Sequence, residues 1–231
     1  MSVPVQVKPE KKWAMEYALM NSRSFYLPVC EPRPMLAARW MTPVVTRDMP
    51  LEAVRRQIMS EQETVLFVHP LSFSEEMSDG ERALLPAVPL AQLKSRYPGV
   101  DEVNRPVRDG RYTPHALYFP DVPVTRSAYE SFPVSLMMAA PVLPAPGAEK
   151  ERLEELKHRL EKTLALAANL GHHHVVLDAF GLEENGFSEV EAAAAMSDVL
   201  SQKTIRSWFS TVTIAPGHRG ENAQRAFEDV F

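Results

Sequence analysis

Glycine is scarce in this sequence, with nine glycines among 231 residues, against an average of about 7% in proteins. No two of these glycines are adjacent or separated by a single residue, so the GxGxxG fingerprint of dinucleotide-binding folds is absent. Loops that wrap a diphosphate need backbone without Cβ atoms in the way. The shortage therefore limits the places at which this chain could hold a nucleotide.

Cysteine and basic charge are also in short supply. The single cysteine, Cys30, excludes an internal disulfide and a multi-cysteine zinc site, and it favours a reducing compartment. The 25 Lys and Arg residues are outnumbered by 30 Asp and Glu residues, which gives a net charge of −5 and no basic footprint for nucleic acid. We therefore expect an intracellular protein, in the cytoplasm or on the cytoskeleton, that binds no nucleic acid.

Long hydrophobic runs are missing as well. The longest weakly polar stretch, Val134–Pro146, contains three prolines and is shorter than the roughly 20 residues of a membrane-spanning helix. The segment Met1–Trp13 mixes apolar residues with Pro, Lys and Glu, and it contains no hydrophobic stretch of the kind found in secretory signals. We expect neither insertion into a membrane nor secretion.

Proline, by contrast, is abundant, with 20 residues in the chain. Residues 1–40 hold five prolines together with five aromatic residues, which are Trp13, Tyr17, Phe25, Tyr26 and Trp40. We expect one short helix from about Glu10 to Asn21 and irregular backbone elsewhere in this segment, because proline interrupts regular structure. Aromatic side chains on an irregular arm need an apolar surface, either the protein's own core or a partner. The sequence therefore predicts an N-terminal arm of residues 1–40, suited to contact with other proteins of a larger assembly, and a domain of residues 41–231.

The domain alternates strand and helix patterns. Asp48 followed by Pro50 marks a helix start, and apolar residues at positions 51, 54 and 58 give that helix one apolar stripe. Short apolar runs predict strands at Thr64–Val68, Ala116–Phe119 and Val134–Ala139.

The C-terminal third has the clearest pattern. Glu149–Leu170 is predicted to form a long amphipathic helix, with leucines spaced by three and four residues, and Gly171 suits a left-handed cap. Ser188 and Glu191 form a capping-box pattern at the start of a further helix. Two strand patterns and a terminal helix complete the order: His173–Phe180, Ser207–Ala215 and Asn222–Phe231. This order predicts a three-layer α/β domain with crossover connections.

The segment from Val175 to Ser188 runs from a strand through a loop into the capped helix. Gly181 and Gly186 have the spacing of a Walker A loop, but Phe187 stands where that loop needs its lysine, so this segment is not a nucleoside-triphosphate loop. The N-terminus of the following helix could still meet an anion. Glutamates at positions 183 and 184 would repel phosphate, and the alternative is a plain strand–helix turn with solvated glutamates.

This segment also resembles the signature of the microbial-type poly(ADP-ribose) glycohydrolase family, macro domains in which a strand runs into a loop of the form LGAWGCGxFGN. The family's leucine, alanine, aromatic residue and two outer glycines are matched by Leu177, Ala179, Phe180, Gly181 and Gly186.

The resemblance extends beyond this loop. Tyr118–Arg126 is similar to the family's SPDVPVFR stretch, Met138–Pro141 to its strand ending in Ala-Pro, and residues 167–174 to its helix end and Gly-His-Asp-His. The likeness covers about residues 41–231. It implies a macro-domain-like α/β/α sandwich with a mixed central sheet, behind the proline-rich arm.

The sequence departs from the family where the family's chemistry takes place. The resemblance implies a glycine-rich catalytic loop followed by Gly-x-x-Ala-Gln-Glu-Glu, whose glutamates act on the ribosyl bond. Here Leu84, Leu85 and Pro86 stand at the last three positions, and their side chains cannot transfer a proton. His69 replaces a ligand-contacting asparagine, and Glu183 replaces the middle glycine of the second loop. We therefore predict no catalytic residue.

Other residues offer three alternatives. Glu75 or Glu76 with Asp178 would form a relocated carboxylate pair, although acids in surface loops are mostly solvated. The histidines of His172–His174 alternate faces on a strand, so at most two could share a metal, and no acidic partner spacing accompanies them. Cys30 lies among prolines with no histidine near it in the sequence, which disfavours a nucleophile. We predict no metal site and no cofactor.

The leading hypothesis is a catalytically degenerate member of this family that acts as a structural or interaction subunit of a larger intracellular assembly. The alternative is a reader that binds ADP-ribose, or an ADP-ribosyl glycohydrolase. Under either hypothesis the remaining cleft is lined by seven residues that match or replace family positions: His69, Gly80, Arg82, Asp178, Phe180, Gly181 and Gly186.

Overall fold

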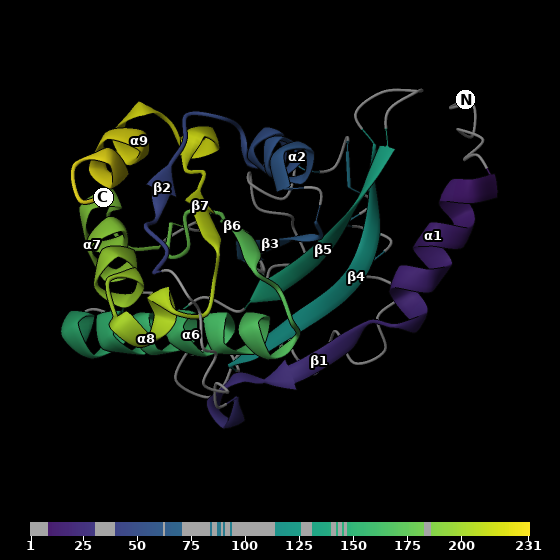
Figure 1. Ribbon diagram of the computed structural model, residues 1–231. Helices are drawn as coiled ribbons and strands as arrows, with labels where there is room; N and C mark the ends of the chain where they lie inside the picture. The colour runs from purple at the N-terminus through teal and green to yellow at the C-terminus, as the bar shows by residue number, and fades with distance from the viewer. Residues whose placement is uncertain are drawn as a thin grey trace, which may run out of the picture.

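The computed structural model describes residues 9–30, 40–61, 63–70, 84, 87–88, 90, 93, 114–125, 131–139, 142, 145, 147–182 and 186–231, with the backbone alone for residues 9–12. Within these residues a seven-stranded sheet forms the centre of the molecule, in the order β1-β4-β5-β3-β6-β7-β2 (Figure 1). The strands are β1 (Arg23–Tyr26), β2 (Val44–Val45), β3 (Val65–Pro70), β4 (His115–Thr125), β5 (Ser131–Ala139), β6 (His174–Leu177) and β7 (Thr211–Ile214). The helices are α1 (Pro9–Met20), α2 (Pro50–Glu61), α6 (Glu149–Asn169), α7 (Glu189–Leu200), α8 (Lys203–Arg206) and α9 (Glu221–Glu228), with 3₁₀ turns η1 (Leu27–Val29) and η2 (Gly217–Arg219).

Five neighbouring strands of the sheet run parallel. β3 lies between β5 and β6, β7 follows β6, and the short strand β2 forms the edge beside β7. β4 is antiparallel both to β5 and to β1. A mixed sheet between helices is the predicted α/β/α architecture, which is thereby confirmed. Because the carboxyl ends of parallel strands meet at one edge, the residues that follow β3, β6 and β7 come close together there.

Two apolar cores lie on the two faces of the sheet. Leu66 and Val68 of β3 belong to the first core, and Val65 and Phe67 belong to the second, as the two-residue period of a strand requires. The first core packs against α6, α7, α8 and α9, and the second against α1 and α2. Every residue of β3 is buried, as predicted for a strand covered on both faces.

Several predicted elements are confirmed with small shifts. The long helix α6 ends at Asn169, and Gly171 follows with φ +84°, the left-handed conformation predicted for its cap. The helices predicted after Asp48 and Ser188 are α2 and α7. The strand predicted at Ser207–Ala215 is shorter, because the Ser207 amide still donates to carbonyls of α8 and the strand begins only at Thr211.

The described part of the N-terminal arm folds onto the domain. β1 pairs antiparallel with β4, so the prediction of irregular backbone after the first helix was wrong for these residues. The stretch Ser22–Leu27 contains no proline, and the edge of β4 supplies backbone hydrogen-bond partners for it. Met15 and Ala18 of α1 are buried in the second core, and Leu27 in the first. None of the helices in the described ranges is long and apolar enough to cross a membrane.

The capping box that the sequence predicted at Ser188 and Glu191 is present at the start of α7. The Ser188 hydroxyl accepts a hydrogen bond from the Glu191 amide (3.4 Å), and the Ser188 amide donates to the Glu191 carboxylate (3.0 Å). We expect Ser188→Ala to lower the free energy of unfolding by about 1 kcal/mol, the usual cost of losing such a cap, as measured by urea denaturation. Ser201→Ala, at the other end of the same helix, is the control and should change it by less than half as much.

Candidate functional site

Three polar residues meet where the parallel strands β3, β6 and β7 end. His69 lies near the end of β3, Asp178 follows β6 directly, and His218 lies in the turn η2 after β7. The strand register brings the first two together, because Val68 of β3 lies opposite Leu177 of β6. Ligands of α/β folds commonly bind outside this carboxyl edge. The arrangement therefore places the predicted residues His69 and Asp178 side by side at the expected edge.

A buried carboxylate joins the two imidazoles. The Asp178 Oδ2 atom lies 2.7 Å from Nδ1 of His69, and their side chains are 1% and 0% exposed. The Asp178 Oδ1 atom accepts a hydrogen bond from the Ala179 amide (2.7 Å) and lies 3.3 Å from Nε2 of His218, whose side chain is 5% exposed. Because an ionised carboxylate only accepts hydrogen bonds, Nδ1 of His69 carries the proton between them.

The surroundings keep Asp178 ionised. Burial by itself raises the pKa of Asp178, but the hydrogen bond from His69 and the charges of His218, His69 and Arg219 outweigh it, so the pKa lies below its usual value. Burial also lowers the pKa of His218, although the charge of Asp178 opposes that effect. Among the described residues, the charge of Asp178 is thus balanced by His69 of β3 and by His218 and Arg219 after β7.

The same cluster contains buried polar atoms without hydrogen-bond partners among the described residues. They are Nε2 of His69, Nδ1 and Nε2 of His218, and Nε and Nη2 of Arg219. The contact of His218 with Asp178 is therefore one of charge rather than of hydrogen-bond geometry. An unsatisfied buried donor or acceptor costs about 1–3 kcal/mol, so such a concentration at one point is an energetic cost that requires a physical reason.

The loop after β6 uses its glycine for packing. Gly181 has φ +98°, and a Cβ atom at this position would lie 2.8 Å from Cδ2 of Leu156 in α6. The neighbouring Phe180 is buried in the first core, and so is Phe187. The resemblance places a ligand-binding loop at these residues. In the structure, Phe180 and Phe187 are buried in the core that includes α6, and Gly181 lies against Leu156.

The backbone amides of this loop are also occupied within the loop. The Phe180 amide donates to the Asp178 carbonyl, the Leu182 amide to the Ala179 carbonyl, and the Phe187 amide to the Gly181 carbonyl. The Ala179 amide is held by the Asp178 side chain. These four N–H groups are therefore not available to a diphosphate.

The remaining predicted site residues are Gly80, Arg82 and Gly186. Gly186 is partly exposed ahead of α7, while Gly80 and Arg82 lie outside the described residues, as do the alternative acids Glu75 and Glu76. Leu84, which stands at the position of the family's glutamine, is buried in the second core.

The consecutive histidines alternate in burial, as predicted, although only His174 lies within β6. His172 and His174 are buried and His173 is exposed. Nε2 of His172 lies 3.0 Å from the Tyr118 hydroxyl, whereas Nδ1 of His174 lies 2.9 Å from the Thr211 hydroxyl. No group of three or more His, Cys, Asp or Glu side chains among the described residues could hold a metal ion.

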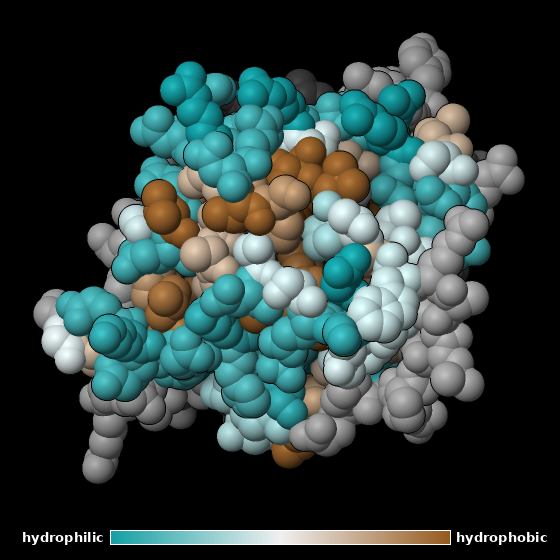
Figure 2. All heavy atoms as spheres, turned by 60° about the vertical axis from the view of Figure 1, so that its left-hand side comes forward, coloured by the Kyte–Doolittle hydropathy of each residue, from teal (hydrophilic) through white to brown (hydrophobic). Residues whose placement is uncertain are grey.

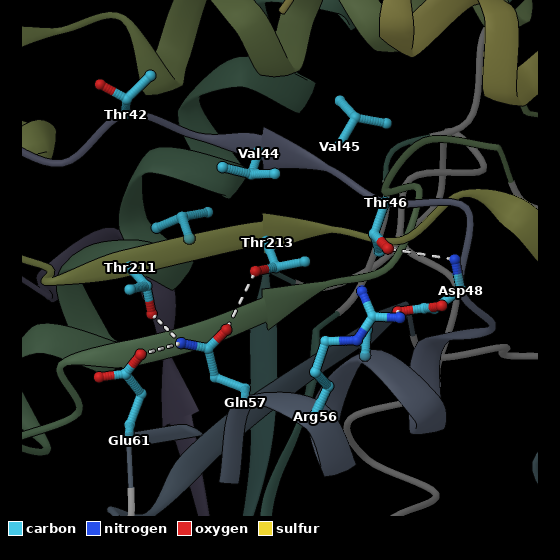
Figure 3. A pocket seen from close by; sticks show the side chains of 12 residues that line it. Thr42, Val44, Val45, Thr46, Asp48, Arg56, Gln57, Glu61, Thr211 and Thr213 are labelled. Atoms are coloured by element: carbon cyan, nitrogen blue, oxygen red, sulfur yellow. Dashed lines mark hydrogen bonds and ion pairs between the residues drawn. The ribbon is translucent and has the colours of Figure 1, made fainter. Parts of the chain in front are cut away.

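A groove that the sequence did not reveal runs along the edge strand β2. It has a volume of about 380 Å³ and is lined by residues of β2, α2 and β7 (Figure 3). The Gln57 amide lies across its floor, donating to the Thr211 hydroxyl (2.7 Å) and accepting from the Thr213 hydroxyl (3.3 Å). Asp48 and Arg56 form an ion pair at one end. The polar groups of the floor thus satisfy one another.

The side of the molecule that carries β2, α7 and α9 has a mixed surface. Figure 2, which turns this side forward, shows apolar residues gathered near the middle of the face within a hydrophilic surround. Exposed apolar side chains include Val44 of β2, Val190 of α7, and Phe231, which follows α9.

Among known proteins, solved structures resemble this fold, whereas family models and curated sequences do not match the chain. The poly(ADP-ribose) glycohydrolase of Thermomonospora curvata, bound to the inhibitor ADP-HPD, superposes with a TM-score of 0.78 at 22% identity, over 94% of this chain and 88% of that one. The poly(ADP-ribose) glycohydrolase of Deinococcus radiodurans, in complex with ADP-ribose, gives a TM-score of 0.79 at 19% identity, over 99% of this chain and 98% of that one.

This chain has the fold of the bacterial poly(ADP-ribose) glycohydrolases. The similarity extends over nearly the whole chain, so the resemblance that was noted on short motifs is confirmed at the level of the fold. Sequence identities near 20% establish a shared fold. What the site of this chain can bind or catalyse depends on the residues that it carries there.

Two residues of the cluster were not predicted. His218 and Arg219 follow β7, which ends at Ile214, and lie in the turn η2. The signal that could have identified them is their position, since they come directly after a strand of a parallel sheet. The resemblance drew attention to the loops after β3 and β6 instead.

The buried His172 gives the protein a pH-dependent stability. Burial, with a smaller contribution from His173, lowers the pKa of His172 to about 4, whereas an unfolded histidine titrates near a pKa of about 6.5. Between these values the unfolded chain binds more protons, so stability falls as the pH falls. We expect this residue to cost about 2 kcal/mol of unfolding free energy between pH 7 and pH 5. His172→Gln should lose that part of the pH dependence in urea denaturation, while His158→Gln, on the exposed surface of α6, should keep it.

Proposed function

We propose that this chain binds ADP-ribose at the carboxyl edge of β3, β6 and β7 and does not cleave it with a glutamate pair. The proposal is supported by the fold, since the similar structures from Deinococcus radiodurans and Thermomonospora curvata hold ADP-ribose and the inhibitor ADP-HPD. It treats the chain as a reader of ADP-ribose rather than as a glycohydrolase.

One observation in this chain carries the proposal. The buried atoms without partners, on His69, His218 and Arg219, all belong to one cluster at the edge where ligands of α/β folds bind. The guanidinium nitrogens of Arg219 donate hydrogen bonds, whereas Nε2 of His69 accepts one when Nδ1 carries the proton, and this combination suits the phosphate oxygens and hydroxyl groups of a nucleotide sugar. A bound ligand would supply the hydrogen bonds that the protein leaves unmade.

The residues at the positions of the family's catalytic Gln-Glu-Glu argue against the family's chemistry. The side chain of Leu84 is buried among apolar residues, and the sequence places Leu85 and Pro86 where the resemblance expects glutamates. Hydrolysis of a bond between two sugars needs a group that protonates the leaving oxygen. Hydrocarbon at these positions leaves that step without its usual agent.

A second candidate function is that of an interaction subunit in a larger assembly, and helix α1 favours it. Trp13, Tyr17 and Met20 are 76%, 52% and 84% exposed. Their spacing of four and three residues puts them on one face of the helix, opposite Met15 and Ala18, which are buried in the core. An exposed stripe of large apolar side chains is typical of a surface that binds another protein.

Calorimetric titration with ADP-ribose tests the first candidate. We expect saturable binding of ADP-ribose by the full chain, and no release of ADP-ribose from poly(ADP-ribose) under conditions in which the Thermomonospora curvata glycohydrolase releases it. Binding with turnover would make the protein an enzyme. The absence of binding would contradict the proposal and leave the subunit role as the better candidate.

The second candidate is tested by changing the exposed face of α1. The triple change of Trp13, Tyr17 and Met20 to Ser should leave the thermal midpoint within a few degrees, because these side chains are exposed, and should abolish the recovery of protein partners in co-purification with mass spectrometry. Val29→Ser, at another exposed apolar position, is the control. Equal recovery with the triple variant would exclude this face as the contact.

A further inference from the structure

We propose that His218 and Arg219, on the turn η2, form the subsite that binds phosphate oxygens, in place of the loop after β6. The identity of the ligand as ADP-ribose rests on the proposed function, whereas the subsite for a pyrophosphate does not. The proposal moves the anion-binding role from the loop that resembles the family's signature to a turn that has no counterpart in that signature.

The loop after β6 is poorly suited to an anion. The amides of Ala179, Phe180, Leu182 and Phe187 donate to oxygens of the loop itself, and the open side of Gly181 faces Leu156. The sequence adds two carboxylates, Glu183 and Glu184. A diphosphate placed there would find few donors and an opposing charge.

The turn η2 provides the donors that the loop lacks. Nε and Nη2 of Arg219 form the edge of the guanidinium that donates two parallel hydrogen bonds to two oxygens of one anion, and both atoms are buried without a partner among the described residues. His218 lies beside Arg219 with a nearly buried side chain, and its Nδ1 also lacks a partner within the described chain.

The backbone around η2 holds these donors in place. Gly217 packs against the loop between β2 and α2, where a Cβ atom would lie 3.2 Å from the Arg47 carbonyl oxygen and 3.3 Å from that of Asp48. Gly220 has φ +97° and begins α9 without a side-chain cap. The first amides of α9 therefore point out of the helix next to Arg219, and the positive end of the helix dipole adds to its charge.

The charges around His218 determine how an anion would interact with it. Asp178, Arg219 and His69 all act on its pKa, and Asp178 is already bonded to His69 and to the Ala179 amide. Glu221 of α9 is exposed and lies near two arginines, Arg225 at 3.2 Å and Arg47 at 4.0 Å. An anion beside His218 favours its protonated form. Binding should therefore take up a proton, and the affinity should rise as the pH falls from 8 to 6.

Calorimetric titrations with inorganic pyrophosphate and with ADP-ribose test the subsite. We expect Arg219→Gln to weaken the binding of both probes at least about tenfold, as is typical for the loss of charge-assisted hydrogen bonds. Arg225→Gln, which removes the same charge from the neighbouring helix, should change the affinity by less than about twofold because it lies outside the subsite. Arg219→Lys keeps the charge without the paired donors and should fall between the wild type and Arg219→Gln.

The outcomes separate this inference from the proposed function. ADP-ribose binding that is unchanged by Arg219→Gln would overturn the subsite and leave the proposed function standing. Pyrophosphate binding that depends on Arg219, without binding of ADP-ribose, would support the subsite and contradict the function. Equal losses in the Arg219 and Arg225 variants would overturn the subsite in favour of general electrostatic attraction, and no binding of either probe would overturn both. Thermal unfolding controls for misfolding, and Arg219→Gln should lower the midpoint only slightly, because Nε and Nη2 have no hydrogen-bond partner among the described residues and Arg219 is the smallest of the charges that lower the pKa of Asp178.

Discussion

A buried carboxylate at the end of β6 organises the functional edge of this protein. Asp178 is almost inaccessible to water and lies between two imidazoles and a backbone amide. A charge in such a place is tolerated only when it is compensated by close partners, and the partners come from β3 and from the turn after β7. The ends of these strands are thus tied together by the need to neutralise a single negative charge. The donors that remain unpaired on the outer atoms of this cluster are a consequence of the same arrangement.

The two glycine-bearing segments near this edge have different tasks. Gly181 is favoured by its φ of +98°, which other residues rarely adopt, and by the close approach of its loop to Leu156 of α6. The glycines of η2 shape a turn that carries a histidine and an arginine toward the cluster. A matching glycine in a signature therefore does not establish that the signature's ligand is bound, because the same lack of a Cβ atom serves packing as well as it serves a phosphate. The atoms that lie against the open side of the glycine show whether it serves packing or ligand binding.

The N-terminal segment combines two surfaces in one short helix. One side of α1 is buried against the sheet, and β1 continues the sheet at its antiparallel edge. The opposite side exposes Trp13, Tyr17 and Met20. The helix therefore packs on the domain with one side and exposes an apolar face on the other. Its packing on the domain leaves that face accessible to a partner.

The sequence by itself determined the features that depend on neighbouring residues. The apolar spacing of α2 and α6, the capping box of α7 and the buried run of β3 are local patterns, and each formed as predicted within a few residues. The family-like motifs pointed to the α/β/α fold and to His69 and Asp178, which follow neighbouring strands and do meet. The sequence could not show that Phe180 and Gly181 serve packing, because that depends on a helix some 25 residues earlier.

Only the tertiary structure decided which distant residues complete the site. His218 and Arg219 lie about 40 residues after Asp178 in the chain, and nothing in their local pattern distinguishes them from a surface turn. They reach the cluster because β7 takes the place beside β6 in the sheet. In the same way, Arg23–Tyr26 became a strand only because β4 offered an unpaired edge. Local preferences select helices and strands, whereas the strand order, which arises from the burial of the whole sheet, selects the residues that meet at its ends.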